Sequence, residues 1–99
     1  MHAVVGVWDM GVGDWEEQQR ALREEIVPLV REAPGFVAGY WMADRAAAKI
    51  HATIVWEDEE AALRFEGFAR GPAGQGSREE AGVGGGSTTV LEVVAATHR

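Results

Sequence analysis

The sequence predicts an α+β domain whose elements follow the order β-α-β-β-α-β, the ferredoxin-like topology with one four-stranded antiparallel sheet. Two observations predict this class. Four short segments are rich in β-branched and aromatic residues, and two longer segments repeat their apolar residues at helical spacing. A chain of 99 residues has the size of one domain, so residues 1–99 are expected to form a single unit.

The four strand segments are apolar at odd and even positions alike. They are predicted at residues His2–Met10, 36–42, Lys49–Trp56 and 88–96. Because side chains alternate across a strand, a solvated face would appear as polar residues at every second position. No segment shows that pattern, so both faces of the sheet need cover. Two helices can cover only one face, and a second copy of the chain is the simplest cover for the other, which predicts a homodimer.

The first helix is predicted after Asp14, which stands at the N-cap position with Glu17 three residues further on. Its apolar residues form one stripe: Trp15, Leu22, Ile26, Leu29, Val30 and Ala33. Pro28 interrupts the helix and is expected to kink it, and Pro34 with Gly35 is expected to end it.

The second helix is predicted to begin after Asp58 and to place Ala62, Phe65 and Ala69 on one apolar face. Residues 44–48, which join the second and third strands, contain no glycine. This favours a loop longer than a two-residue turn.

Glycine is concentrated late in the chain. Eight of the 13 glycines lie in residues 67–87, where a mobile loop is expected, with one helical turn at residues 77–81. A strand follows these glycines, and no Lys-Ser or Lys-Thr pair does, so a phosphate-binding loop is not indicated.

Composition excludes several classes of function. The formal charge of −7 opposes binding to nucleic acid, whose phosphates require a basic face. No apolar run approaches the roughly 20 residues of a membrane helix, so no membrane partner is expected. The chain has no cysteine, which excludes disulfides and thiolate chemistry and suits a cytoplasmic location. Its three histidines lack metal-ligand spacing, so neither a metal nor another cofactor is expected.

Several fragments occur together in a recurring order. They are residues 34–36 (PGF), residues 40–45 (YWMADR), Lys49, residues 55–61 (VWEDEEA) and residues 91–93 (LEV). In this order they resemble the antibiotic biosynthesis monooxygenase-like family, a group of small dimeric α+β barrels. The resemblance covers nearly the whole chain, and its motifs mark a fold more than an active site.

The resemblance implies that two sheets meet face to face in a dimer and enclose a barrel. Members of the family include cofactor-independent oxygenases acting on polyketide phenols, haem-degrading enzymes, quinol oxygenases and proteins with no known reaction. The haem-degrading members ligate iron through a histidine near the second helix, and residues 58–78 contain none. Two departures are the glycine-rich loop and Ala48, which replaces the glycine usual before the lysine.

The strand tryptophans are the candidates for substrate binding. Trp8, Trp41 and Trp56, together with Ile54, are expected to form the walls of a pocket able to stack on an aromatic ligand. The alternative for each is a place in the core or in the dimer interface. Trp15 lies on the helical stripe and is assigned to packing.

The face of the third strand that looks into the barrel decides the chemistry of this pocket. The family pattern favours the face of Ile54 and Trp56, which makes the cavity apolar and places His51 and Thr53 under the helices or at the sheet margin. With the opposite face inside, His51 and Thr53 line the cavity instead. His51 is then a candidate general base on a phenol, because its unperturbed pKa lies near neutrality.

Glu92 and Tyr40 complete the catalytic candidates beside His51. Glu92 is the one acid in an apolar strand, and it serves either as a base in the cavity or as a charge that discourages wrong strand pairing. Tyr40 either donates a hydrogen bond to a substrate carbonyl or packs. Asp44 and Arg45 are expected to shape the hairpin turn rather than to bind substrate, and an ion pair between them is one way to do so.

Two classes of function follow. One is a cofactor-independent monooxygenase or a protein that binds a small aromatic or quinone-like compound, and the other is a non-catalytic binding or structural dimer on the same fold. In the first class the deprotonated substrate itself reduces oxygen, so the protein supplies a base, desolvation and orientation.

Overall fold

The computed structural model describes residues 1–10, 14–71 and 83–99. Its elements in chain order are β1 (His2–Met10), α1 (Trp15–Ala21), η1 (Leu22–Ile26), α2 (Val27–Arg31), β2 (Phe36–Asp44), β3 (Lys49–Trp56), α3 (Glu59–Arg70) and β4 (Val83–Glu92). The segment η1 is a π-helical turn, so α1, η1 and α2 together form the first of the two predicted helices. The predicted order of elements is confirmed.

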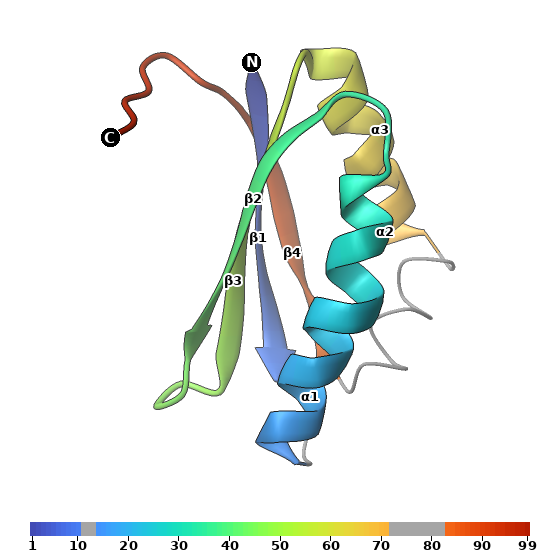
Figure 1. Ribbon diagram of the computed structural model, residues 1–99, viewed down its shortest axis with the longest axis vertical. Helices are drawn as coiled ribbons and strands as arrows, with labels where there is room; N and C mark the ends of the chain where they lie inside the picture. The colour runs from blue at the N-terminus through green and yellow to red at the C-terminus, as the bar shows by residue number, and fades with distance from the viewer. Residues whose placement is uncertain (11–13, 72–82) are drawn as a thin grey trace.

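The four strands form one antiparallel sheet in the order β2-β3-β1-β4. Strands β1 and β3 are therefore central, and β2 and β4 are the edges. Figure 1 shows the sheet from the side, with the helices all on one side of it. We call the side beneath the helices the helical face and the opposite side the open face.

The central strands have the predicted bounds, and the edge strands differ. Strand β2 continues to Asp44, and β4 spans Val83–Glu92 rather than the predicted residues 88–96. The reason is the length of β1, whose first residue, His2, pairs with Glu92. The Val93 N–H donates to the Met1 carbonyl (2.9 Å), and beyond this bond the segment runs past the end of β1.

The glycine-rich region is partly regular structure, which corrects the predicted loop at residues 67–87. Helix α3 continues to Arg70, and β4 begins at Val83. At Gly86 a methyl group would lie 1.9 Å from the Val7 carbonyl oxygen, so this glycine allows the close approach of β4 to β1. The expected helical turn at residues 77–81 lies outside the described residues.

Both helix starts have the predicted caps. The Asp14 carboxylate accepts from the backbone N–H of Glu16 (2.8 Å) and Glu17 (3.3 Å), and the Asp58 carboxylate accepts from Ala61 N–H (2.8 Å). Each side chain satisfies backbone donors that have no partner within the helix. None of the described helices is both long and apolar enough to span a bilayer.

Pro28 is accommodated by the π-helical turn that precedes it. Proline has no N–H, and its ring collides with the carbonyl four residues back, here Glu24. In η1 the helix widens, and the Val27 N–H bonds to the Leu22 carbonyl, five residues back. The predicted disturbance of this helix therefore takes the form of a wide turn.

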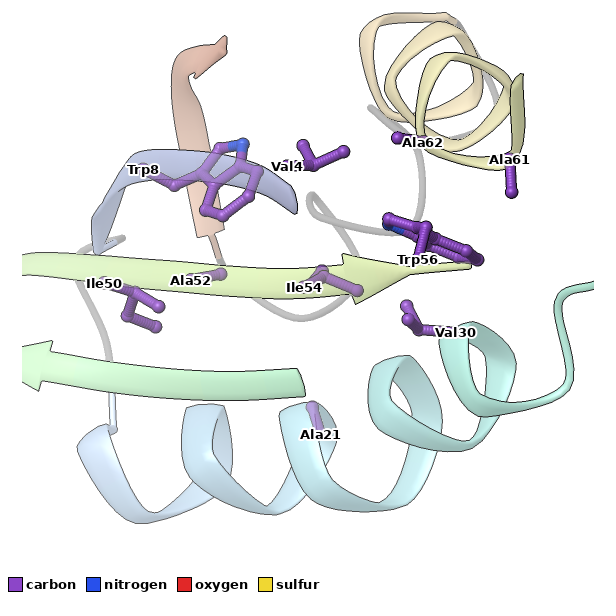
Figure 2. Packing of buried hydrophobic residues seen from close by; sticks show 10 residues of the cluster. All are labelled: Val4, Trp8, Ala21, Val30, Ile50, Ala52, Ile54, Trp56, Ala61 and Ala62. Atoms are coloured by element: carbon purple, nitrogen blue, oxygen red, sulfur yellow. The ribbon is translucent and has the colours of Figure 1, made fainter. Parts of the chain in front are cut away.

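The core lies between the helical face and the helices. Trp56, Ile54 and Val4 are its largest fully buried side chains, and Figure 2 shows Trp56 at the end of β3, between Val30 of α2 and the alanines of α3. The indoles of Trp8 and Trp41 lie flat along their own strands, Trp8 over Gly6 and Trp41 over Gly39. A methyl group at Gly6 would lie 2.3 Å from the Trp8 ring.

This contact predicts the effect of one small substitution. Gly6→Ala should lower the free energy of unfolding by about 1–3 kcal/mol, because the Trp8 ring must leave its place over the strand. The matched control is Gly67→Ala on α3, where an added methyl group meets nothing within 4 Å and helix propensity favours alanine. Urea denaturation measures both, and equal stability of Gly6→Ala and the parent protein would contradict the packing described.

Candidate functional site

The structure corrects the assignment of the two sheet faces. Trp56 and Ile54 lie on the helical face and are buried, whereas His51 is exposed on the open face and Thr53 shares that face. The expectation that the Trp56 face looks into a barrel, with His51 under the helices, is therefore wrong. Both faces of β3 are largely apolar, so alternation alone could not show which one the helices cover.

The helical face carries a cavity of about 400 Å³ at the end of β3, between α2 and α3. We call it the Trp56 cavity. Its apolar lining comes mainly from Leu29, Val30, Trp56, Ala61, Phe65 and Phe68. Glu32 and Arg64 contribute the charged groups of the lining.

Aromatic rings form one wall of the Trp56 cavity. The rings of Trp56 and Phe65 stack with centroids 5.0 Å apart and planes at 30°, and Phe36 meets Trp56 edge-on at 6.0 Å. Phe65 and Phe68 are three residues apart on α3, so they share a side of the helix. Trp56 is only 1 % exposed, whereas Phe68 is 41 % exposed. The cavity therefore combines a fixed aromatic wall with an accessible one.

At this end of the sheet, the backbone at Gly35 packs closely against the start of α3. Gly35 has a φ of +87°, and a methyl group there would lie 2.6 Å from the Ala61 side chain. The Gly35 carbonyl also accepts a hydrogen bond from the Glu57 N–H (2.8 Å). These contacts fix the start of α3 against the segment that leads into β2, and thereby set the spacing of α2 and α3 around the cavity.

A second cavity, of about 340 Å³, lies between the first helix and the strands β2 and β3. Trp15 and Trp41 contribute its two indoles. The Arg45 guanidinium lies over the Trp15 ring, 4.5 Å from its centroid, which is a cation–π contact. Asp44 accepts a hydrogen bond from the Ala47 N–H (3.1 Å), so this acid shapes the turn as expected. Arg45 instead contacts Trp15 of α1.

The predicted substrate-binding residues are divided among the core and the two cavities. Trp56 lines the Trp56 cavity and Trp41 lines the second cavity. Trp8 and Ile54 are buried in the core and line neither. Trp15, assigned to packing, lines the second cavity.

The three predicted catalytic residues are not brought together. His51 and Tyr40 lie on the open face, two strand positions apart, because His51 pairs with Met42. Glu92 is exposed at the end of β4, opposite His2 on the helical side of the sheet. None of the three lines either cavity.

Sequence reasoning missed the role of α3 in the site. The sequence predicts an apolar face of this helix that includes Phe65, and no motif in it points to Arg64. The available signal was the short distance in sequence between Trp56 and this helix. When a helix follows at once on a strand that ends in tryptophan, the first two turns of the helix lie beside the indole if the indole is on the face that the helix covers.

Comparisons with known proteins identify the fold. No protein-family model and no curated protein matches the chain. Among solved structures, the haem degrader MhuD from Mycobacterium tuberculosis, with two hemes bound in its active site, is 20 % identical over 99 % of this chain and 100 % of its own, with a TM-score of 0.70. SnoaB, a cofactor-independent oxygenase from Streptomyces nogalater, is 14 % identical over 96 % and 94 %, with a TM-score of 0.70.

A third structure holds a bound ligand. The ActVA-Orf6 monooxygenase of Streptomyces coelicolor, in complex with nanaomycin D, is 18 % identical over 99 % of this chain and 91 % of its own, with a TM-score of 0.65. Two more matching structures carry the name antibiotic biosynthesis monooxygenase. At these identities the likeness establishes the fold alone, and the predicted ferredoxin-like fold, shared with proteins named antibiotic biosynthesis monooxygenase, is confirmed.

The described lining of the Trp56 cavity does not suit haem. Haem iron is held by histidine, cysteine, methionine or tyrosine side chains. None of these is among the residues found to line the cavity, whose charged groups are Glu32 and Arg64. No step through haem is derived for this chain.

Proposed function

We propose that this chain binds a planar, largely apolar aromatic compound in the Trp56 cavity and promotes its oxidation by molecular oxygen without a cofactor. The observation that carries the proposal is the stacked pair of Trp56 and Phe65 in an almost wholly apolar lining. A flat ring system buries its faces against such a wall and leaves its polar edge toward the opening. The oxygenases SnoaB and ActVA-Orf6, which share this fold, support the choice of reaction.

The reaction needs no external reductant. In a hydroxylated anthrone, the ring CH2 loses a proton, and the resulting carbanion transfers electrons to O2. One oxygen atom becomes the new ring carbonyl, and the other leaves as water with the two hydrogens of the CH2 group. The protein's share is to hold the ring, exclude water and accept a proton.

Glu32 is the carboxylate best placed for the proton in this scheme. Among the described residues that line the Trp56 cavity it is the only acid, whereas Arg64 is the cation and is paired with Glu60 (3.4 Å). His51, Tyr40 and Glu92, the candidates from the sequence, lie elsewhere and remain weaker proposals for this role.

Non-catalytic binding of the same class of compound is the second candidate. It is favoured by the exposure of Glu32, because a solvated carboxylate is a weak base toward a phenol or an activated CH2.

A chain without cysteine suits the reducing cytoplasm, which is where we propose that either function is carried out.

Two measurements on one panel of compounds separate these candidates. Hydroxylated anthrones and naphthoquinols are tested for their effect on the melting temperature and for oxygen uptake above solution oxidation. We expect both a thermal shift and uptake for at least one planar member. A shift without uptake supports non-catalytic binding, and neither effect across the panel counts against a site for such compounds.

The accessible wall of the cavity predicts a selective loss of binding. Phe68→Ala should weaken binding of an active panel compound about tenfold, because it removes one aromatic face from the ligand. The matched control is Leu63→Ala on the same helix, where Leu63 is 50 % exposed and is not among the lining residues. Titration of the intrinsic tryptophan fluorescence measures both affinities. Equal affinities for the two variants would place the ligand elsewhere.

We further propose that two copies of the chain pack through their open faces. The large side chains of Tyr40, Met42 and Leu91 lie on this face and are about half exposed or more. Val5, Val7 and Val55 extend the apolar surface between them. A second copy covers this surface with the same residues, as two-fold symmetry requires.

A charge on the open face should separate the copies. Tyr40 is 59 % exposed, so Tyr40→Glu is expected to leave the fold intact and to shift the protein from dimer to monomer in sedimentation velocity. Leu63→Glu, on the helical side, should leave the dimer unchanged. A parent protein that sediments as a monomer would refute the proposed assembly.

A further inference from the structure

The second cavity is large enough to hold a small molecule of its own. Its volume of about 340 Å³ lies within the range of ligand pockets, roughly 300–1,000 Å³. Leu22, Val27 and Ile50 form much of its apolar lining. The residues found to line it and those found to line the Trp56 cavity do not overlap, so a ligand here is independent of the proposed function.

Two half-buried indoles line the second cavity from distant parts of the chain. Trp15 comes from the start of α1, and Trp41 comes from the edge strand β2. Trp41 is held along its strand by Gly39, where a methyl group would lie 2.9 Å from the ring. The ring pairs found among the described residues all involve Trp56, so neither indole stacks on another ring. An aromatic ligand can supply the missing partner for both.

The charge around the second cavity is positive. Arg23 lines the cavity from an exposed position, and its Nη1 donates to the Gln19 side chain (3.4 Å). The Arg45 guanidinium covers the Trp15 ring, 4.5 Å from the centroid. No acid is among the described residues of this lining. In a chain with a formal charge of −7, such a place is suited to an anion.

The acids of the first helix interact with a different arginine. Arg20 pairs with Glu17, with Glu24 (2.7 Å) and with Glu25 (3.9 Å). Within the described ranges, neither Arg23 nor Arg45 forms an ion pair with a carboxylate. Their guanidinium groups can therefore bind the carboxylate of a ligand, which matches their planar set of donors.

Polar groups shielded from water add to this preference. Gln18, in the lining, is only 6 % exposed. The Trp15 Nε1–H is buried and has no acceptor among the described residues. A buried donor without an acceptor is unfavourable, so a ligand oxygen that accepts from it strengthens binding. The site thus favours a ligand that carries oxygen as well as an aromatic ring.

We propose that the second cavity binds a small aromatic carboxylate. Its ring packs between Trp15 and Trp41, and its carboxylate pairs with Arg23, which is exposed and therefore gives up little hydration on binding. Arg45 holds the Trp15 indole in place through the cation–π contact and adds positive charge beside the ligand.

Binding of naphthalene-2-carboxylate tests the proposal, with the neutral naphthalene-2-carboxamide as the matched compound. NMR titration follows the indole N–H signals of the four tryptophans, assigned with single Trp→Phe variants. We expect the carboxylate to shift the Trp15 and Trp41 signals saturably and to bind about tenfold more tightly than the amide. A shift confined to Trp56, equal affinities for the two compounds, or no shift at about 10 mM carboxylate would overturn the proposal.

Two arginine variants test whether the carboxylate binds at one place. Arg23→Gln should weaken binding of the carboxylate about tenfold and leave the amide unchanged, because it removes the charge and keeps hydrogen-bond donors. The matched control is Arg31→Gln, at an exposed position of α2 outside the lining, which should change neither affinity. Equal losses in the two variants would show attraction to the overall charge and would contradict a carboxylate site at Arg23.

A variant that fills the second cavity tests it without altering a charge. Ala43 is exposed on β2 and lines the cavity. Ala43→Phe should keep the melting temperature of the parent protein, because phenylalanine suits a strand, and should weaken binding of the carboxylate about tenfold. Ala46→Phe, in the turn after β2 and outside the lining, should bind as the parent protein does. A folded Ala43→Phe variant with undiminished affinity would show that the ligand does not occupy this cavity.

Discussion

The structure depends on one mismatch: a sheet that is apolar on both faces has helices on only one of them. The single helical layer buries Trp56, Ile54 and Val4, and these side chains supply the main driving force for folding of the protomer. The same layer leaves Tyr40, Met42 and Leu91 exposed on the open face. The proposed assembly and the proposed ligand binding therefore belong to different faces of the same sheet.

The cavity on the helical face arises from how the helices are spaced. Ala61, Ala62 and Ala69 let α3 lie close to the sheet, and Gly35 meets Ala61 at the start of that helix. In the first helix, a wide π-helical turn at Leu22–Ile26 comes just before Pro28 and α2. Between α2 and α3, the Trp56 indole is buried and borders the cavity.

The helix caps could be predicted from the sequence, but the face of the sheet that the helices cover could not. Asp14 and Asp58 act as the expected caps because a carboxylate before a helix satisfies backbone donors whatever the rest of the chain does. The sides of His51 and Trp56 depend on which face meets the helices, and β3 is too apolar on both faces to show it. The glycines at the start of β4 suggested a loop, because the role of Gly86, its close approach to β1, is visible only between strands.

The location of the cavity changes how assembly and function are connected. A pocket inside a barrel would exist only in the dimer, and its ligand would hold the two copies together. The Trp56 cavity is instead formed within one protomer, by α2, α3 and the end of β3. A ligand there gains nothing from the second copy unless binding shifts α3, so its affinity and dimerisation should be independent to first order. In the proposed dimer, the polar groups of the open face, His51 and Thr53, shape the interface between copies rather than the chemistry of the ligand.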